Sequence, residues 1–459
     1  MANLIAPFAN AKPEEIALVD DFGETTWTDF NERVNQLVHA LRDKGLKTGD
    51  AFAVVSGNRR EYFEAFAAAA HGGWLLVPVN WHLVAKEVAY ILADSGSKAL
   101  LVDSRFVELA EATMLQPERP NLDVVVIMGT EADTFADETE QAVSYEAFLS
   151  EQATAEPEDQ LLGGPMFYTS GTTGHPKGVK SGLSQTGAPV DVLKMIGEGI
   201  SGMLGIASGG KSLLVGPVYH SAQWAFSFLP LLAGTSVVMR HKFDGEEVLR
   251  LIDQYQITNT HLVPTQFTRM LRLGDGIRKA FDGSSLGVVW HGAAPCPPQI
   301  KRRMIEWWGP VINEYYGSTE GSIVTTVSSE DWLSRPGTLG KPVAIMEILV
   351  IKEDGSHDEA GESGTLYVKN LMGSDFEYHN APEKTSDAHL EPGVFTFGDV
   401  GYLDQDGYLF MSDRKIDMII SGGVNIYPAE IEGTLIDHPA IMDAAVFGVP
   451  NEEFGEEVK

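Results

Sequence analysis

Apolar strand patterns alternate with helical patterns along the first 160 residues, and this alternation limits the possible folds more than any other feature of the sequence. Between residues 28 and 44, apolar residues recur at intervals of three and four, which predicts an amphipathic helix that stops at Gly45. The next segments predict in turn a strand, a helix, a strand, a helix and a strand, at 51–56, 62–70, 74–79, 84–95 and 99–102. Strands separated by helices form parallel sheets with helices on their faces. The sequence therefore predicts an α/β fold.

The predicted secondary-structure pattern changes twice after this region. Alternating strand and helix patterns resume at Met166 and continue to about Val327, whereas the pattern at 337–371 predicts short strands joined by turns. Asp404 to Gly407 is a hairpin signal between two short apolar segments. We expect a large N-terminal domain at 1–413, with two α/β sheets and a small β-rich subdomain at about 335–412. We expect 414–459 to begin a small α+β C-terminal domain that is incomplete.

The charge balance excludes some partners. The chain has 459 residues, 33 Lys and Arg against 65 Asp and Glu, and a formal net charge of −32. Such a chain repels nucleic acid and anionic membranes. Cys296 is the only cysteine, so no intrachain disulfide can form, and the N-terminus lacks a secretory signal pattern. The uncharged stretch 212–239 contains prolines and a histidine, which favours a buried helix followed by a strand over a membrane span. We expect a cytoplasmic protein.

The most informative segment is rich in glycine and hydroxyl side chains. It follows a short apolar strand and reads Tyr-Thr-Ser-Gly-Thr-Thr-Gly-His-Pro-Lys-Gly over residues 168–178. Glycines allow backbone N–H groups to turn toward an anion, hydroxyls add donors, and Lys177 adds positive charge. In the Walker A loop a Ser or Thr follows the lysine, whereas Gly178 follows here. The segment therefore predicts a phosphate-binding loop of another type.

This loop resembles the signature loop of the adenylate-forming superfamily, which includes acyl-CoA synthetases, peptide-synthetase adenylation domains and luciferases. The resemblance runs from about Thr26 to the last residue and is closest to AMP-forming acyl-CoA synthetases for fatty and aryl acids. It implies that Thr172 and Lys177 act on the phosphates of ATP. The loop residues that it assigns to ATP are Thr169, Ser170, Gly171, Thr172, Thr173, Gly174 and Lys177.

Two further motifs resemble the family's adenine-binding segments. His291-Gly-Ala-Ala-Pro295 follows an apolar strand, and Glu314-Tyr-Tyr-Gly-Ser-Thr-Glu320 comes next in the expected order. A tyrosine ring offers a face for stacking on adenine, and a carboxylate oxygen is a hard ligand for Mg²⁺. The resemblance implies that Tyr316 stacks on adenine, that Thr319 binds phosphate and that Glu320 is catalytic and holds Mg²⁺. The nucleotide-binding residues that it assigns here are Gly292, Ala293, Ala294, Pro295, Glu314, Tyr315, Tyr316, Gly317 and Thr319.

The ribose and coenzyme A segments follow at the usual distances. Asp399 lies between glycines in Phe-Gly-Asp-Val-Gly, where a carboxylate can accept both ribose hydroxyls, and Arg414 adds a permanent cation. The resemblance assigns both residues to the nucleotide. It assigns Ser421, Gly422 and Gly423 to the loop beside the pantetheine arm of coenzyme A.

The predicted acyl pocket contains His220, Trp224 and His291. Peptide-synthetase adenylation domains hold the substrate ammonium with an aspartate, and His220 occupies that place here. An ammonium without a counter-charge in a buried site is poorly compensated, so an amino acid is disfavoured. Simple core packing is the alternative for both His220 and Trp224. We expect a fatty acid first and an aryl acid second.

The implied reaction is a two-step ligation that uses ATP, Mg²⁺ and coenzyme A. A carboxylic acid becomes an acyl-adenylate and then an acyl thioester. Loading of a carrier protein, or nucleotide binding without catalysis, are the alternative functions. The resemblance is compatible with a homodimer.

Two positions depart from the family. The hinge position holds the apolar Ile416 where aspartate or lysine is usual. The family's C-terminal catalytic lysine falls beyond Lys459, so we expect the 459-residue chain to form adenylate poorly.

Overall fold

The computed structural model describes residues 4–129, 142–169, 175–352, 354–356, 361–414, 419–421, 424–426, 428–436, 438, 440–441, 444–451 and 455–459. The phosphate-loop residues 170–174, the hinge position Ile416 and the glycines Gly422 and Gly423 lie outside these ranges. The chain divides into two compact units. Unit 1 contains 1–261, 282–287 and 377–381, and unit 2 contains 262–281, 288–376 and 382–459.

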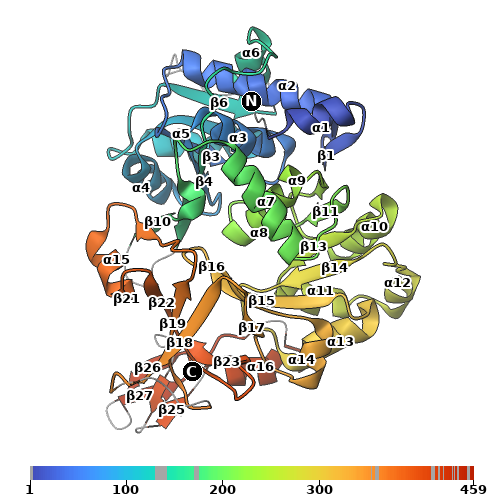
Figure 1. Ribbon diagram of the computed structural model, residues 1–459, viewed down its shortest axis with the longest axis vertical. Helices are drawn as coiled ribbons and strands as arrows, with labels where there is room; N and C mark the ends of the chain where they lie inside the picture. The colour runs from blue at the N-terminus through green and yellow to red at the C-terminus, as the bar shows by residue number, and fades with distance from the viewer. Residues whose placement is uncertain are drawn as a thin grey trace. The chain divides into compact units, whose positions relative to one another are not determined.

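Unit 1 begins with a parallel sheet in the strand order β7-β6-β5-β3-β4-β8. Helices cover both faces of this sheet, and α2 packs against α3 on one of them (Figure 1). The helices and strands up to this point are α1 Ala6–Ala11, β1 Ile16–Asp20, β2 Gly23–Thr26, α2 Trp27–Asp43, β3 Ala51–Val55, α3 Arg60–Gly72, β4 Leu75–Val79, α4 Ala85–Ser95, β5 Ser97–Asp103, α5 Val107–Met114, β6 Val124–Met128, β7 Ala142–Ser144, α6 Tyr145–Ser150 and β8 Gly164–Pro165. These elements confirm the α/β pattern predicted for the first 160 residues.

Successive side chains of strand β3 pack into two different hydrophobic cores, one on each face of the sheet. On β3, Phe52 and Val54 pack with α2, α3 and α6, whereas Ala53 and Val55 pack with α4 and α5. Successive side chains of a strand point to opposite faces, so a sheet covered on both faces needs apolar residues at every position. The burial pattern of β3 shows this, because all five of its residues are buried.

The rest of unit 1 forms a second sheet and a hairpin. The second sheet has the order β13-β11-β12-β1-β2, and the hairpin sheet has the order β20-β10-β9. The remaining elements are β9 Phe167–Thr169, β10 Lys177–Lys180, α7 Asp191–Met203, β11 Lys211–Leu214, α8 Ser221–Ala225, α9 Phe228–Leu232, β12 Ser236–Met239, α10 Gly245–Tyr255, β13 Asn259–Leu262 and β20 Glu377–Tyr378. The prediction for 212–239 was incomplete, because strand β11 comes first and the helical part is split into α8 and α9. In the part of the chain that is described, no helix is long and apolar enough to cross a membrane.

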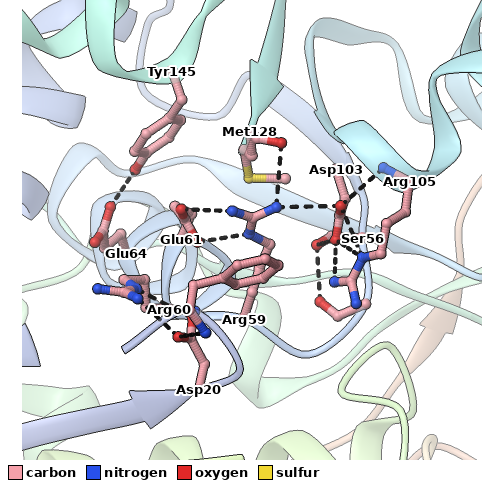
Figure 2. Close-up of polar contacts among 12 residues, drawn as sticks. Asp20, Ser56, Arg59, Arg60, Glu61, Glu64, Asp103, Arg105, Met128 and Tyr145 are labelled. Carbon is pink, nitrogen blue, oxygen red and sulfur yellow. Dashed lines mark hydrogen bonds and ion pairs between the residues drawn. The ribbon is translucent and has the colours of Figure 1, made fainter. Parts of the chain in front are cut away.

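The carboxyl ends of β3 and β5 carry a network of buried charges (Figure 2). Strands β3 and β5 are neighbours in the sheet. After β3 the chain continues to β4 on one side, and after β5 it continues to β6 on the opposite side, so the loops that follow these two strands diverge. Arg59, which is 2% exposed, donates to Glu61 and lies 3.2 Å from Asp103. The Asp103 carboxylate also accepts from Arg105 and from the Ser56 hydroxyl. Since every charge in this network has a charged partner, the network can remain buried.

The described residues of unit 2 contribute strands to three sheets. Their strand orders are β17-β16-β15-β14, then β18-β19-β22-β21 with β23 beside β22, and finally β25-β24-β27-β26. The elements are α11 Pro264–Leu271, α12 Asp275–Ala280, β14 Val288–His291, α13 Pro298–Trp308, β15 Ile312–Ser318, β16 Ser322–Val327, α14 Ser329–Ser334, β17 Lys341–Pro342, β18 Met346–Ile351, β19 Gly364–Asn370, α15 Pro382–Ala388, β21 His389–Glu391, β22 Val394–Leu403, β23 Leu409–Arg414, β24 Ile419–Ser421, β25 Val424–Ile426, α16 Pro428–Ile436, β26 Gly448–Asn451 and β27 Gly455–Val458. The hairpin predicted at 404–407 is confirmed, because β22 and β23 pair on either side of it.

Candidate active site

The phosphate-loop segment connects two antiparallel strands of unit 1. Strand β9 ends at Thr169 and β10 begins at Lys177, and these two residues are register partners. Strand β9 continues the apolar run after Pro165, and Gly178 and Val179 of β10 are buried. Thr169 and Lys177, the described residues of this segment that are predicted to bind ATP, therefore lie opposite each other. The described residues on either side of the segment thus belong to two paired strands, whereas a strand and a helix flank a Walker A loop.

Lys177 has an aromatic neighbour in the strand beside it. Its Nζ lies 4.9 Å from the centroid of the Tyr378 ring, and Tyr378 belongs to β20, which pairs with β10. An ammonium over a ring face is attracted by the ring quadrupole. The ring thus supports the lysine at the first position after the loop.

The adenine and ribose candidates meet in unit 2. The hydroxyl of Tyr316 on β15 donates a 2.6 Å hydrogen bond to Oδ2 of Asp399 on β22. Asp399 is 4% exposed, and Arg414 on β23 is its register partner. The structure therefore brings Tyr316, Asp399 and the backbone of Arg414 together, although they are far apart in the sequence.

A tight hairpin presents Glu320 after β15. The Ser318 hydroxyl accepts the backbone N–H groups of Glu320 and Gly321, at 3.1 Å and 3.0 Å. Gly317 must lack a side chain, because a Cβ there would lie 2.0 Å from the Ser322 carbonyl oxygen. This turn holds Thr319 and Glu320 at the end of β15. Among the described residues, no three His, Cys, Asp or Glu side chains gather as a metal-binding group.

Glu314, predicted to bind ATP, forms a buried ion pair. Its Oε2 accepts a 2.7 Å hydrogen bond from Nζ of Lys301, which is fully buried on α13. Burial raises the pKa of Glu314, and the Lys301 ammonium opposes this shift. Burial likewise lowers the pKa of Lys301, and Glu314 opposes that shift. The carboxylate of Glu314 is thus engaged with Lys301 within unit 2.

The segment after β14 begins buried and then becomes exposed. His291 is fully buried, with Nε2 3.7 Å from Oε2 of Glu314. A Cβ on Gly292 would lie 2.6 Å from the ring of Tyr315, so only glycine fits here. Ala293 has a φ of 64°, an uncommon value for a residue with a side chain. Ala293, Ala294 and Pro295 are exposed at this turn, as a segment that borders a ligand requires.

The two remaining acyl-pocket candidates belong to unit 1 and differ in exposure. His220 is exposed at the position before α8. Trp224 is 1% exposed, and its ring centroid lies 5.7–6.1 Å from those of Phe66, Phe167 and Phe228. Its Nε1 has no hydrogen-bond partner among the described residues. This environment favours the core-packing alternative for Trp224.

Sequence reasoning missed two residues that support the site. Lys301 occupies the buried face of α13 together with Ile300, Met304 and Ile305. A lysine on an apolar helix stripe was the available signal, since a buried ammonium needs a charged partner. Tyr378 carried no such signal, because nothing in the sequence links β20 to a strand about 200 residues earlier.

Comparison with known proteins identifies the family to which this chain belongs. The AMP-binding enzyme family matches residues 6–372. A 2-succinylbenzoate–CoA ligase from Bacillus subtilis is 30% identical over 99% of this chain and 86% of its own length. A long-chain-fatty-acid–CoA ligase from Mycobacterium tuberculosis is 30% identical over 94% of this chain and 81% of its own length.

Solved structures agree with the fold. The o-succinylbenzoate CoA synthetase of Bacillus subtilis, in complex with its acyl-adenylate intermediate, superposes with a TM-score of 0.79 at 28% identity. The alignment covers 100% of this chain and 87% of that one. An anthranilate CoA ligase in complex with anthranoyl-AMP has the same fold, with a TM-score of 0.85 at 24% identity and coverage of 99% and 85%.

The fold is the mixed α/β architecture of the adenylate-forming enzymes. The chain belongs to the AMP-binding enzyme family. The comparisons do not bear out the expectation that the 459-residue chain would be poorly active.

Proposed function

We propose that the chain activates a carboxylic acid with ATP and transfers the acyl group to coenzyme A. The acid that we propose first is a fatty acid, and an aryl acid is second. Relatives of equal identity support either choice, because one is a ligase for 2-succinylbenzoate and another for long-chain fatty acids. A histidine at position 220, where adenylation domains for amino acids have an aspartate, argues against an amino acid because it offers no negative charge to the ammonium.

The observation that carries the proposal is the hydrogen bond between Tyr316 and Asp399. It joins the ring proposed to stack on adenine to the carboxylate proposed to accept the ribose hydroxyls, with Arg414 paired across the strands. Because the side chains of Tyr316 and Asp399 meet and the backbone of Arg414 lies beside them, we propose a nucleoside monophosphate as the ligand of this part of unit 2.

In the first proposed step, a substrate carboxylate oxygen attacks the α-phosphorus of ATP. The bond from that phosphorus to the bridging oxygen breaks, and pyrophosphate leaves. Lys177 and the hydroxyl of Thr169 would hold the departing phosphates, together with Thr172 and Thr173. Fixed donors stabilise the charge that develops on phosphoryl oxygens, and bound geometry supplies most of the acceleration.

Glu320 is the residue that we propose for Mg²⁺. A carboxylate oxygen suits this hard cation, and the Ser318 turn holds the backbone of Glu320 beside Thr319. Bound Mg²⁺ would neutralise negative charge on the phosphates.

In the second proposed step, the thiolate sulfur of coenzyme A attacks the acyl carbon of the adenylate. The carbon–oxygen bond to AMP breaks, giving a thioester and AMP. The backbone at Ser421 on β24, followed by Gly422 and Gly423, is the segment proposed beside the thiol arm.

The test is pyrophosphate release with a panel of fatty, aryl and amino acids. Release with fatty or aryl acids, and none with amino acids, is the expected result. Acyl transfer to free coenzyme A, compared with transfer to a carrier protein, then identifies the acceptor. Binding of AMP without pyrophosphate release for any acid would contradict the proposal in favour of a non-catalytic nucleotide-binding protein.

A further inference from the structure

Two residues one turn apart on α4 contact the two sides of the β9–β10 hairpin. The hydroxyl of Tyr168, the residue before Thr169, donates a 2.7 Å hydrogen bond to Oδ2 of Asp94. On the other side of the loop, the ring of His175 stacks on Tyr90, with centroids 4.4 Å apart and an interplanar angle of 23°. Residues four apart lie on the same helix face, so a single face of α4 contacts both sides.

A segment distant in sequence completes this support. The backbone N–H of His379 donates to the Gly178 carbonyl oxygen at 2.7 Å, beside the pairing of β20 with β10. The side-chain amide of Asn380 donates to the backbone carbonyl oxygen of Asp94 at 3.1 Å and to its Oδ1 at 3.2 Å. The last carbonyls of a helix lack intrahelical donors, so Asn380 satisfies one that α4 leaves open. Asp94 therefore holds both Tyr168 and the strand that flanks Lys177.

Gly178 allows these groups to meet. A Cβ at this position would lie 3.1 Å from Cζ of Tyr168 and 3.2 Å from Cβ of His379. Contacts this short require the neighbours to move. The bare backbone therefore lets the Tyr168 ring and His379 lie against β10, next to Lys177.

We propose that Asp94 and Tyr90 are positioning residues for the adenylation step, which fix the strand ends carrying Thr169 and Lys177. The inference rests on the proposed function, because it assumes that these two residues hold ATP phosphates. Neither Asp94 nor Tyr90 needs to touch the substrate. Preorganised donors lose much of their effect when they are misplaced by about 1 Å. Loss of the contacts that Asp94 and Tyr90 make with the hairpin should therefore weaken phosphate binding without removing any phosphate ligand.

The hydrogen bond between Tyr168 and Asp94 persists over a wide pH range. Burial, together with the hydrogen bond to the Asp94 carboxylate, raises the pKa of Tyr168. The hydroxyl therefore stays protonated and remains a donor at neutral and mildly alkaline pH. Hydrogen bonds to a charged acceptor are the stronger kind.

The first test compares the two half-reactions of Tyr168→Phe and Asp94→Ala. We expect the KM for ATP in pyrophosphate release to rise about tenfold, as expected for loss of one hydrogen bond to a charged group. Thioester formation from preformed acyl-adenylate requires no pyrophosphate to be held, so its rate should stay within about twofold of the unmodified protein. Asp94→Asn keeps an amide oxygen that can accept from Tyr168, and it should recover most of the affinity for ATP.

A matched control lies in the same unit. The hydroxyl of Tyr145 on α6 donates a 2.6 Å hydrogen bond to Oε2 of Glu64, which is likewise a bond from a tyrosine to a carboxylate but lies away from the hairpin (Figure 2). Tyr145 is 1% exposed, so Tyr145→Phe should lower stability at least as much as Tyr168→Phe. It should leave the KM for ATP unchanged. An equal rise in KM for both variants would mean that general destabilisation is the cause, and the positioning role would be wrong.

Tyr90 is tested through its ring. Tyr90→Phe keeps the stacking on His175 and should behave as the unmodified protein, whereas Tyr90→Ala should raise the KM for ATP.

Calorimetry with ATP distinguishes failure of the proposed function from failure of the positioning role. No ATP uptake by the unmodified protein would overturn both the proposed function and this inference. Uptake of equal affinity by the unmodified protein, Tyr168→Phe and Asp94→Ala would overturn the positioning role alone.

Discussion

The hydroxyl of Tyr316 lies 2.6 Å from Oδ2 of Asp399, and this hydrogen bond joins strand β15 to strand β22 within unit 2. Its geometry orients the ring proposed to stack on adenine relative to the carboxylate proposed to contact a ribose. A short bond from a neutral hydroxyl to a carboxylate is stronger than one between neutral groups. The two motifs are therefore coupled through this hydrogen bond, and a change in either should affect the other.

Tyr316→Phe keeps the ring and removes the hydroxyl that donates to Asp399. We expect the affinity for AMP to fall roughly ten- to a hundredfold, since such a bond contributes about 1.5–3 kcal/mol. Calorimetric titration with AMP measures the change. Tyr402→Phe is the control, because Tyr402 lies on the same strand as Asp399, and it should bind AMP normally. Unchanged affinity in Tyr316→Phe would show that the bond does not organise a nucleotide site.

Lys301→Met should destabilise unit 2 by about 3–5 kcal/mol, because it leaves Glu314 buried without a counter-charge. The loss should grow with pH. Without Lys301 the pKa of Glu314 rises further above its unfolded value of 4.5, so the folded state holds this proton more tightly than the unfolded state. The free energy of unfolding then falls as pH rises from about 4.5 toward neutrality. Urea unfolding at pH 5 and pH 7 measures the difference.

The double variant Lys301→Met/Glu314→Met is the control for the ion pair. Two apolar side chains of similar length leave no buried charge, so most of the lost stability should return. A double variant as unstable as Lys301→Met, or a single variant equally stable at both pH values, would mean that packing of Lys301 against Trp332 matters more than its charge.

Local patterns predicted much of the fold. The helix predicted at 28–44 is α2, Trp27–Asp43, and it begins where the Thr26 hydroxyl accepts the backbone N–H of Asp29. A Thr followed three residues later by a carboxylate is a local signal that sequence displays directly. The buried strand at 51–56 and the hairpin at 404–407 were predictable for the same reason, because each depends on neighbouring residues alone.

Contacts between distant segments could not be predicted in this way. Glu314 matched a nucleotide motif, yet its carboxylate pairs with Lys301 on a different element. Trp224 carried an apolar signal that is equally typical of a pocket and of a core, and only its neighbours Phe66, Phe167 and Phe228 favour the core. Side-chain partners of this kind depend on which elements the fold brings together, and periodicity does not contain that information.

Asp103→Asn should weaken unit 1 by about 2–4 kcal/mol at pH 7, because Arg59 loses a buried counter-charge. Hydrogen bonds and charges from Arg105 and Arg59 outweigh burial and lower the pKa of Asp103 below its usual 3.8. Its stabilisation is therefore complete above about pH 4 and disappears as pH falls through the lowered pKa. The gap in stability between the variant and the unmodified protein should therefore narrow as pH falls below 3.8, as measured by urea unfolding at a series of pH values. Asp123→Asn, at an exposed site, should follow the unmodified protein throughout, and a gap that does not narrow as pH falls would contradict the ionic origin.

Glu320→Gln tests the proposed magnesium ligand. The amide is the same size and keeps one oxygen, but it removes the negative charge that attracts a divalent cation. Pyrophosphate release should need roughly tenfold more Mg²⁺ for half-maximal rate, corresponding to about 1.4 kcal/mol of lost binding free energy. Glu330→Gln is the control, since Glu330 is exposed on α14 of the same unit, and its Mg²⁺ dependence should match the unmodified protein. If Glu320→Gln reaches half its maximal rate at the unmodified protein's Mg²⁺ concentration, the metal is held by other groups and Glu320 serves the hairpin instead.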